Sequence, residues 1–126
     1  MFRRHGLKSF ALASSAAVLL GAIGTFSATA GPSKGNAEAG KAIFTTKCVV
    51  CHKADGAGGV KLTGNPTPNW KVAKRMADPK FNDDYLRDCI TNGKTKSGMV
   101  AWGKTGQIKP AQIEDLIAYI HTFAKK

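Results

Sequence analysis

Three segments of the chain repeat apolar residues every three or four positions, the spacing that places side chains on one face of an α-helix. These segments cover residues 36–48, 82–92 and 110–123. Each begins with a helix-start signal, because Asn36 and Asn82 are good N-caps and Pro110 suits a first helical position. Strand-like alternation is almost absent. The pattern therefore predicts an all-α fold with about three main helices.

Two long segments without helical periodicity separate these helices. They span residues 53–81 and 94–109 and are rich in Gly, Pro, Asn and Lys. Loops of this length are uncommon inside a small compact domain. A large apolar ligand would explain them, because the loops could wrap around it while it replaced missing core side chains. The loops therefore predict a bound prosthetic group.

The first 30 residues have the composition of a secretory signal peptide. Arg3, Arg4 and Lys8 form a basic start, a run of small and apolar residues follows, and Ala-Thr-Ala at positions 28–30 matches a signal-peptidase site. The run is short and rich in Ser, Gly and Ala for a membrane span. We expect cleavage after residue 30, a periplasmic location and no transmembrane anchor; a retained anchor is the alternative. Residues 31–126 then form one small domain.

Charge narrows the class of partner. The chain has 19 Lys and Arg against eight Asp and Glu, a formal net charge of +11. Residues 1–30 hold three of the basic residues and no acidic ones, so the mature chain keeps a net charge of +8. The scattered lysines fit either a plain soluble surface or steering towards an acidic partner or an anionic membrane. No nucleic-acid-binding motif is visible, so we expect no nucleic-acid partner.

Cys48-Val49-Val50-Cys51-His52 has the spacing of a c-type haem attachment motif. Residues three and four apart share one face of a helical turn, so two thiols and one imidazole can meet the edge of one porphyrin and its iron. The thiols form thioethers with the haem vinyl groups, and His52 becomes the proximal iron ligand. The motif predicts one covalent haem c bound by Cys48, Cys51 and His52.

Three other sites use two cysteines at this spacing. A thioredoxin-like redox pair needs a preceding strand and a βαβ unit, which the pattern does not predict. A zinc site needs two further ligands, and only Cys89 and His121 remain after residue 31, each alone on a helix. A disulfide between Cys48 and Cys51 stays an alternative, but it explains neither the adjacent His52 nor the long loops.

The second axial iron ligand is expected among three side chains beyond the motif. Met99 lies in the flexible segment 97–103, where its thioether could reach the open face of a haem. Met76 is flanked by basic residues and suits a solvated turn. His121 lies near the end of the last helix, where an exposed side chain is the simpler interpretation. We therefore expect Met99 to bind the iron.

Cys89 is left over after haem attachment. It shares an apolar stripe with Leu86 and Ile90, which predicts a small buried core residue. An intermolecular disulfide in an oxidising compartment is the alternative.

From about residue 36 to residue 123, the chain resembles a short class I c-type cytochrome. The likeness rests on Gly40, Phe44, the motif at 48–52, the Met99 segment and residues 116–120. It implies a class I cytochrome c fold over residues 31–126, with long loops wrapped around one covalent haem. In this family a glycine of the first helix admits an aromatic residue of the last. Gly40 is therefore expected to meet Tyr119 or its neighbourhood, with Phe44 beside them.

The resemblance also implies contacts around the iron ligands. A proline carbonyl in the first long loop would accept a hydrogen bond from Nδ1 of His52; Pro66 and Pro68 both qualify, and Pro68 fits the family pattern better. Trp70 would donate to a haem propionate or pack within its loop. The family usually has proline directly after the methionine ligand. Here Val100 stands in its place.

The sequence shows no further catalytic constellation, such as a second haem motif or a nucleophile beside a base. Methionine–histidine ligation raises the reduction potential of a haem. The predicted function is therefore a monomeric one-electron carrier, not an enzyme, whose redox partners have acidic docking surfaces. A dedicated cytochrome subunit of a larger periplasmic oxidoreductase is one alternative. A gas-binding or peroxidase-like haem protein is the other.

Overall fold

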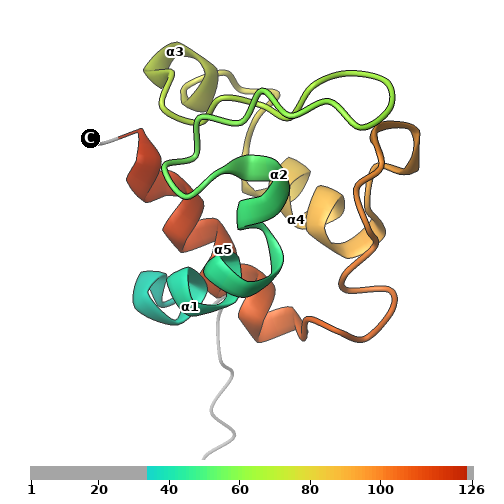
Figure 1. Ribbon diagram of the computed structural model, residues 1–126. Coiled ribbons are helices and arrows are strands. Elements are labelled where there is room, and N and C mark those ends of the chain that lie inside the picture. Colours follow the sequence, from blue (N-terminus) through green and yellow to red (C-terminus); the bar gives the residue numbers. More distant parts are fainter. Residues whose placement is uncertain (1–33, 125–126) are drawn as a thin grey trace, which may run out of the picture.

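The computed structural model describes residues 34–124, and within this range the chain is helical (Figure 1). The elements are α1 (Ala37–Lys47), α2 (Val49–His52), α3 (Ala73–Met76), α4 (Asp83–Asn92), the 3-10 turn η1 (Thr95–Ser97) and α5 (Pro110–Phe123). No strand occurs between residues 34 and 124, and one isolated bridge pairs Lys94 with Met99. The all-α prediction is confirmed. The predicted signal peptide lies outside the described residues.

The three long helices begin at the predicted residues. The side-chain oxygen of Asn36 accepts hydrogen bonds from the backbone N–H of Glu38 and Ala39, at 2.9 and 3.2 Å. Asn82 caps α4 in the same way and accepts from the N–H of Tyr85 at 2.9 Å. These bonds satisfy donors that a helix start leaves free. The helix starts are therefore fixed by local side-chain chemistry.

Two single-turn elements inside the predicted loops were not expected. The four-residue α3 interrupts the first loop, and η1 interrupts the second. An isolated turn is too short to repeat an apolar face, so its sequence carries no periodic signal. Both turns border the large cavity of the molecule, because α3 contributes a basic side chain to its lining and η1 lies beside Met99.

α1, at the lower left of Figure 1, crosses α5 so closely that the two backbones are in contact. A Cβ on Gly40 would lie 2.0 Å from the carbonyl oxygen of Asp115, so only glycine permits this approach. One turn further along α1, the ring of Phe44 meets that of Tyr119 edge-on at 5.3 Å. The implied helix crossing is confirmed. Gly40 contacts Asp115, one turn before Tyr119, while Tyr119 packs against Phe44.

Aromatic rings fill the core next to this crossing. Phe44 packs against Phe123 with ring centroids 5.3 Å apart, and Trp70 from the first loop stacks on Phe123 at 5.9 Å. On the far side of α5, Arg87 of α4 binds Glu114 through two hydrogen bonds of 2.6 and 3.0 Å. α5 is therefore the element to which α1, α4 and the first loop are all joined.

Gly40→Ala is expected to lower the free energy of unfolding by roughly 1–2 kcal/mol. Helix propensity alone favours alanine by up to about 1 kcal/mol. The new methyl group would meet the Asp115 carbonyl, however, and overpacking costs about 1–3 kcal/mol when backbone must move. Denaturant unfolding of the haem-loaded protein measures the difference. Ala42→Gly, at an exposed position of α1, measures the effect of helix propensity alone. If Gly40→Ala stabilised the protein by as much as Ala42→Gly destabilises it, the close crossing would be contradicted.

Candidate haem site

A cavity of about 1050 Å³ is lined by α2, α4, α5 and both long loops. Its volume lies just above the range of roughly 300–1,000 Å³ found for sites that bind small molecules and cofactors. The helices contribute an apolar wall made of Leu86, Cys89, Ile90, Leu116 and Ile120. This wall is the apolar stripe of α4 together with two residues of the α5 stripe, so parts of the predicted core faces line a cavity large enough for a porphyrin.

The motif at 48–52 forms the helical turn that its spacing predicted. The backbone N–H of His52 donates to the carbonyl of Cys48 at 3.0 Å, which brings the first cysteine and the histidine onto one face. Cys48, Cys51 and His52 all line the cavity, whereas Val50 is 78% exposed. The two thiols and the imidazole are therefore available to one ligand.

Burial sets the protonation state of these groups. Burial lowers the pKa of His52 to about 4, so its imidazole is neutral at neutral pH and has a lone pair for a metal. Burial raises the pKa of the Cys48 thiol to about 11, with Lys47 acting in the opposite direction. The site therefore holds a neutral histidine ring and a protonated thiol.

Two buried nitrogen atoms at the cavity lack a hydrogen-bond partner among residues 34–124: Nδ1 of His52 and Nε1 of Trp70. Such atoms are rare in folded proteins, because each one costs free energy unless a ligand or another group satisfies it. The two rings stack 4.4 Å apart at 9°. A haem fits this site, because its propionate carboxylates can accept a hydrogen bond from the indole N–H of Trp70 and its iron can be bound by the other ring nitrogen of His52.

The first long loop folds back onto the motif and places Trp70 there. The hydroxyl of Thr67 donates to the carbonyl of Cys51 at 2.8 Å, and the backbone N–H of Trp70 donates to the carbonyl of Gly56 at 2.9 Å. Sequence reasoning missed this support, because both bonds join residues at least 14 positions apart. The loop is thus held closed at the site.

The expected hydrogen bond between His52 and a proline carbonyl is not formed in this structure. Pro66 and Pro68 both line the cavity, but Nδ1 of His52 has no partner in the described chain. The carbonyl of Pro68 lies against Gly58, where a Cβ would be 2.1 Å from it. The histidine ring lies flat on Trp70 instead, so stacking sets its orientation.

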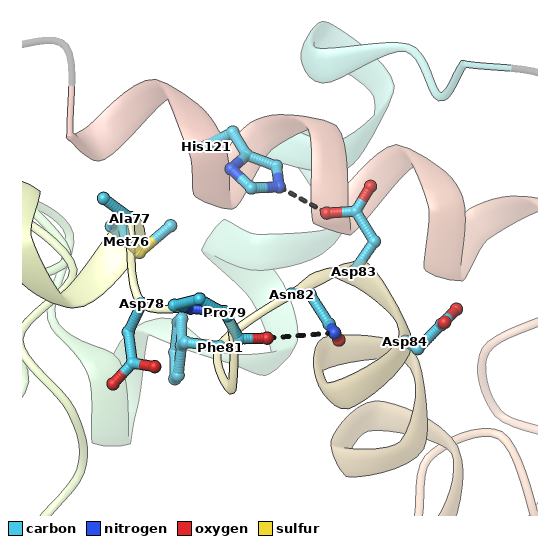
Figure 2. A pocket seen from close by; sticks show the side chains of 9 residues that line it. All are labelled: Met76, Ala77, Asp78, Pro79, Phe81, Asn82, Asp83, Asp84 and His121. Atoms are coloured by element: carbon cyan, nitrogen blue, oxygen red, sulfur yellow. Dashed lines mark hydrogen bonds and ion pairs between the residues drawn. The ribbon is translucent and has the colours of Figure 1, made fainter.

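Met99 lines the haem cavity, whereas the two rival ligands do not. Met76 and His121 line a separate pocket of about 470 Å³ beside the start of α4, shown in Figure 2. There Nε2 of His121 is hydrogen-bonded to a carboxylate oxygen of Asp83 at 2.6 Å, with the histidine side chain 38% exposed. Position alone therefore favours the methionine chosen from the sequence.

Cys89 is 7% exposed, as the apolar stripe predicted, and it also lines the cavity. Burial of this degree opposes the alternative of an intermolecular disulfide. Arg75 of α3 also reaches the cavity, and sequence reasoning missed this contribution because α3 itself was not predicted. No local signal marks this arginine among the other basic residues of the loop.

Comparison with known proteins agrees with this site. A family model described as cytochrome C oxidase, cbb3-type, subunit III matches residues 35–120. Cytochrome c6 of Rippkaea orientalis is 36% identical over 86 residues, which cover 68% of this chain and 69% of the relative. Cytochrome c6 of Limnospira maxima is 30% identical over 95 residues, covering 73% of this chain and 98% of that protein. Cytochrome c of Gossypium barbadense is 32% identical over 98 residues, covering 68% and 88%.

These matches extend over the helices, both long loops and the motif, and they fit the all-α fold around a haem-sized cavity. The cytochromes of this group carry electrons on a haem fixed by thioethers. The chain therefore belongs to the class I c-type cytochromes, and it is a small monohaem electron carrier with one covalently bound haem c.

Proposed function

We propose that this protein is exported to the periplasm and moves single electrons between a donor protein and an acceptor protein. The cavity carries the proposal, because its wall holds two cysteines, a neutral buried histidine and a methionine. When bound, the haem supplies the chemistry, since its iron alternates between ferrous and ferric forms. Residues 34–124 contain no cluster of three or more His, Cys, Asp or Glu that could bind a further metal.

In this proposal six residues of the cavity contact the haem or its iron. Cys48 and Cys51 would hold the haem as thioethers, and His52 and Met99 would bind its iron. Trp70 donates its buried N–H to a haem propionate, because that nitrogen needs an acceptor. Pro68 lines the same cavity and would contact the bound haem.

The proposed partners present acidic surfaces to the haem cavity. Among residues 34–124, four basic residues line this cavity, Lys47, Arg75, Lys94 and Lys96, and no Asp or Glu does. A rim of one sign attracts a partner of the other sign and speeds encounter without adding much affinity. No helix within residues 34–124 combines the length and hydropathy that crossing a bilayer requires. We propose a monomer that meets its partners briefly.

A redox titration of the haem-loaded protein, followed by its visible spectrum, tests the proposal as a whole. We expect one reversible one-electron transition and a ferric spectrum with the weak far-red charge-transfer band of methionine ligation. Rapid binding of carbon monoxide by the untreated ferrous protein, with a five-coordinate spectrum, would contradict the carrier role and support a gas-binding haem protein.

Salt is expected to slow the reaction with an anionic redox reagent. The rate of oxidation by ferricyanide should fall about tenfold or more between ~0.01 M and ~0.5 M ionic strength, because salt screens the basic rim. Lys96→Gln should lower the low-salt rate, whereas Lys41→Gln, an equal loss of charge on the exposed face of α1, should leave it nearly unchanged. Equal effects of the two variants would mean that the rim does not steer.

A second candidate is a cytochrome subunit of a larger oxidoreductase. The matching family model is described as a subunit of a cbb3-type oxidase, which is the observation that favours this role. Purification of the native protein separates the two candidates. A stoichiometric partner that stays bound at high salt would support the subunit, while a single haem protein of monomer size would support the free carrier.

A further inference from the structure

Met99 belongs to a tight loop that is closed at its ends. The N–H and the carbonyl of Met99 pair with the carbonyl and the N–H of Lys94, both at 3.1 Å, and residues 94–99 form what we call the Met99 loop. Val100, the next residue, is 45% exposed and does not have the fixed φ angle that proline would bring. Any resistance of this loop to movement must therefore come from other contacts.

Three consecutive residues of the first long loop contact the Met99 loop. The hydroxyl of Thr63 donates to the carbonyl of Lys96 at 2.9 Å, across 33 positions of sequence. A Cβ on Gly64 would lie 2.6 Å from that same carbonyl, so the two backbones touch. A Cβ on Gly98 would lie 3.1 Å from Leu62, whose side chain covers the glycine next to Met99. We call residues 62–64 the loop latch.

The latch joins the first long loop directly to the Met99 loop. Leu62 lines the haem cavity, and its side chain also contacts Gly98. Gly64 has φ +51° and Gly98 has φ +80°, conformations that glycine adopts without strain. The approach of the two loops thus depends on a glycine in each of them.

We propose that the loop latch positions Met99 for iron ligation, with Thr63 as its main polar contact. The inference rests on the proposed ligation by Met99. Release of the thioether requires the Met99 loop to move away from the cavity, and this movement breaks the bond from Thr63 to Lys96. The latch therefore lowers the fraction of molecules in which the iron position is open.

The rate at which cyanide binds to the ferric haem-loaded protein measures that open fraction. Cyanide takes the coordination position of Met99, so the Fe–S bond must break before the Fe–C bond forms, with no change of oxidation state. Thr63→Val keeps the shape of the side chain and removes the donor. We expect it to bind cyanide roughly two- to tenfold faster than the unmodified protein, the effect of losing one hydrogen bond.

Two further variants make the test specific. Thr63→Ser keeps the hydroxyl group and should restore the slow rate. Thr46→Val removes an exposed threonine hydroxyl that donates within α1, to the carbonyls of Ile43 at 2.9 Å and Ala42 at 3.3 Å, and Thr46 does not line the cavity. This variant should leave the cyanide rate unchanged. Unfolding by denaturant should report similar small losses of stability for both valine variants.

Each other outcome overturns the latch in a distinct way. Equal rates in Thr63→Val and the unmodified protein would mean that the bond does not restrain Met99. Equal acceleration in Thr63→Val and Thr46→Val would assign the effect to general destabilisation, and fast binding in Thr63→Ser would assign it to side-chain shape. Fast binding and no far-red band in the unmodified protein would instead refute ligation by Met99, the assumption on which the latch rests.

Discussion

Replacing both Cys48 and Cys51 by serine should yield a protein with no covalently bound haem. A serine hydroxyl does not form the thioether that joins a cysteine to a haem vinyl group, so only His52 and weak contacts would hold the porphyrin. Mass spectrometry of protein made with a working maturation system should show the loss of one haem mass. Extraction with acidic acetone should remove all remaining colour from the variant and none from the unmodified protein.

Cys89→Ser is the matched control for this experiment. It makes the same chemical change at a cysteine that lines the same cavity but lies outside the motif. Its mass should still include one haem. Covalent haem in the double variant, or none in the unmodified protein, would contradict the attachment residues. The same measurement on Cys89→Ser also shows whether this third thiol takes any part in attachment.

Loss of the haem should also weaken the fold. The cavity occupies the space that a larger domain would fill with side chains, and the two long loops line it. Without a ligand, the loop residues that line the cavity lose an apolar partner whose contacts would offset the entropy of ordering them. The double variant should therefore show increased proteolysis within residues 53–81, while α1 and α5 keep their crossing through Gly40.

The helices were predictable because their signals are local. The caps at Asn36 and Asn82 act on backbone groups two or three residues away, and the apolar repeats of α4 and α5 are visible in the sequence itself. Which turn of α5 meets Gly40 was not predictable, since either turn leaves the same apolar pattern. The structure places the contact at Asp115.

The motif was predictable for the same reason, because five consecutive residues bring both thiols and the imidazole together. The contacts around the motif were not predictable from the sequence. The stacking of His52 on Trp70 joins residues 18 positions apart, and the bond from Thr63 to Lys96 spans 33. Such contacts depend on how two loops fold against each other, and neither loop has a periodic pattern that fixes its path.

The choice of Met99 as the second iron ligand depends partly on the sequence and partly on the fold. Sequence context favoured Met99 over Met76 only through the character of their flanking residues. Position in the fold gives a stronger reason, because the two methionines line separate pockets. The chain therefore offers two chemically identical side chains, one placed to bind the iron and one not, which is the arrangement that a substitution experiment needs.

Met99→Ala should abolish the far-red charge-transfer band of the ferric protein and lower its reduction potential. Thioether ligation stabilises the ferrous state relative to other axial arrangements. Axial ligands set haem potentials over a range of ~0.8 V, so we expect the loss of this one to lower the potential by on the order of 0.1 V or more. The ferric variant should also bind cyanide without waiting for a protein ligand to leave.

Met76→Ala is the control, because it removes the same side chain from a residue that lines the pocket beside α4 and not the haem cavity. Met76 packs against the core, so its loss should cost stability while band and potential stay at their original values. An unchanged band in Met99→Ala would mean that another residue binds the iron. If Met76→Ala then lost the band, α3 would have to move its methionine from the pocket beside α4 into the haem cavity.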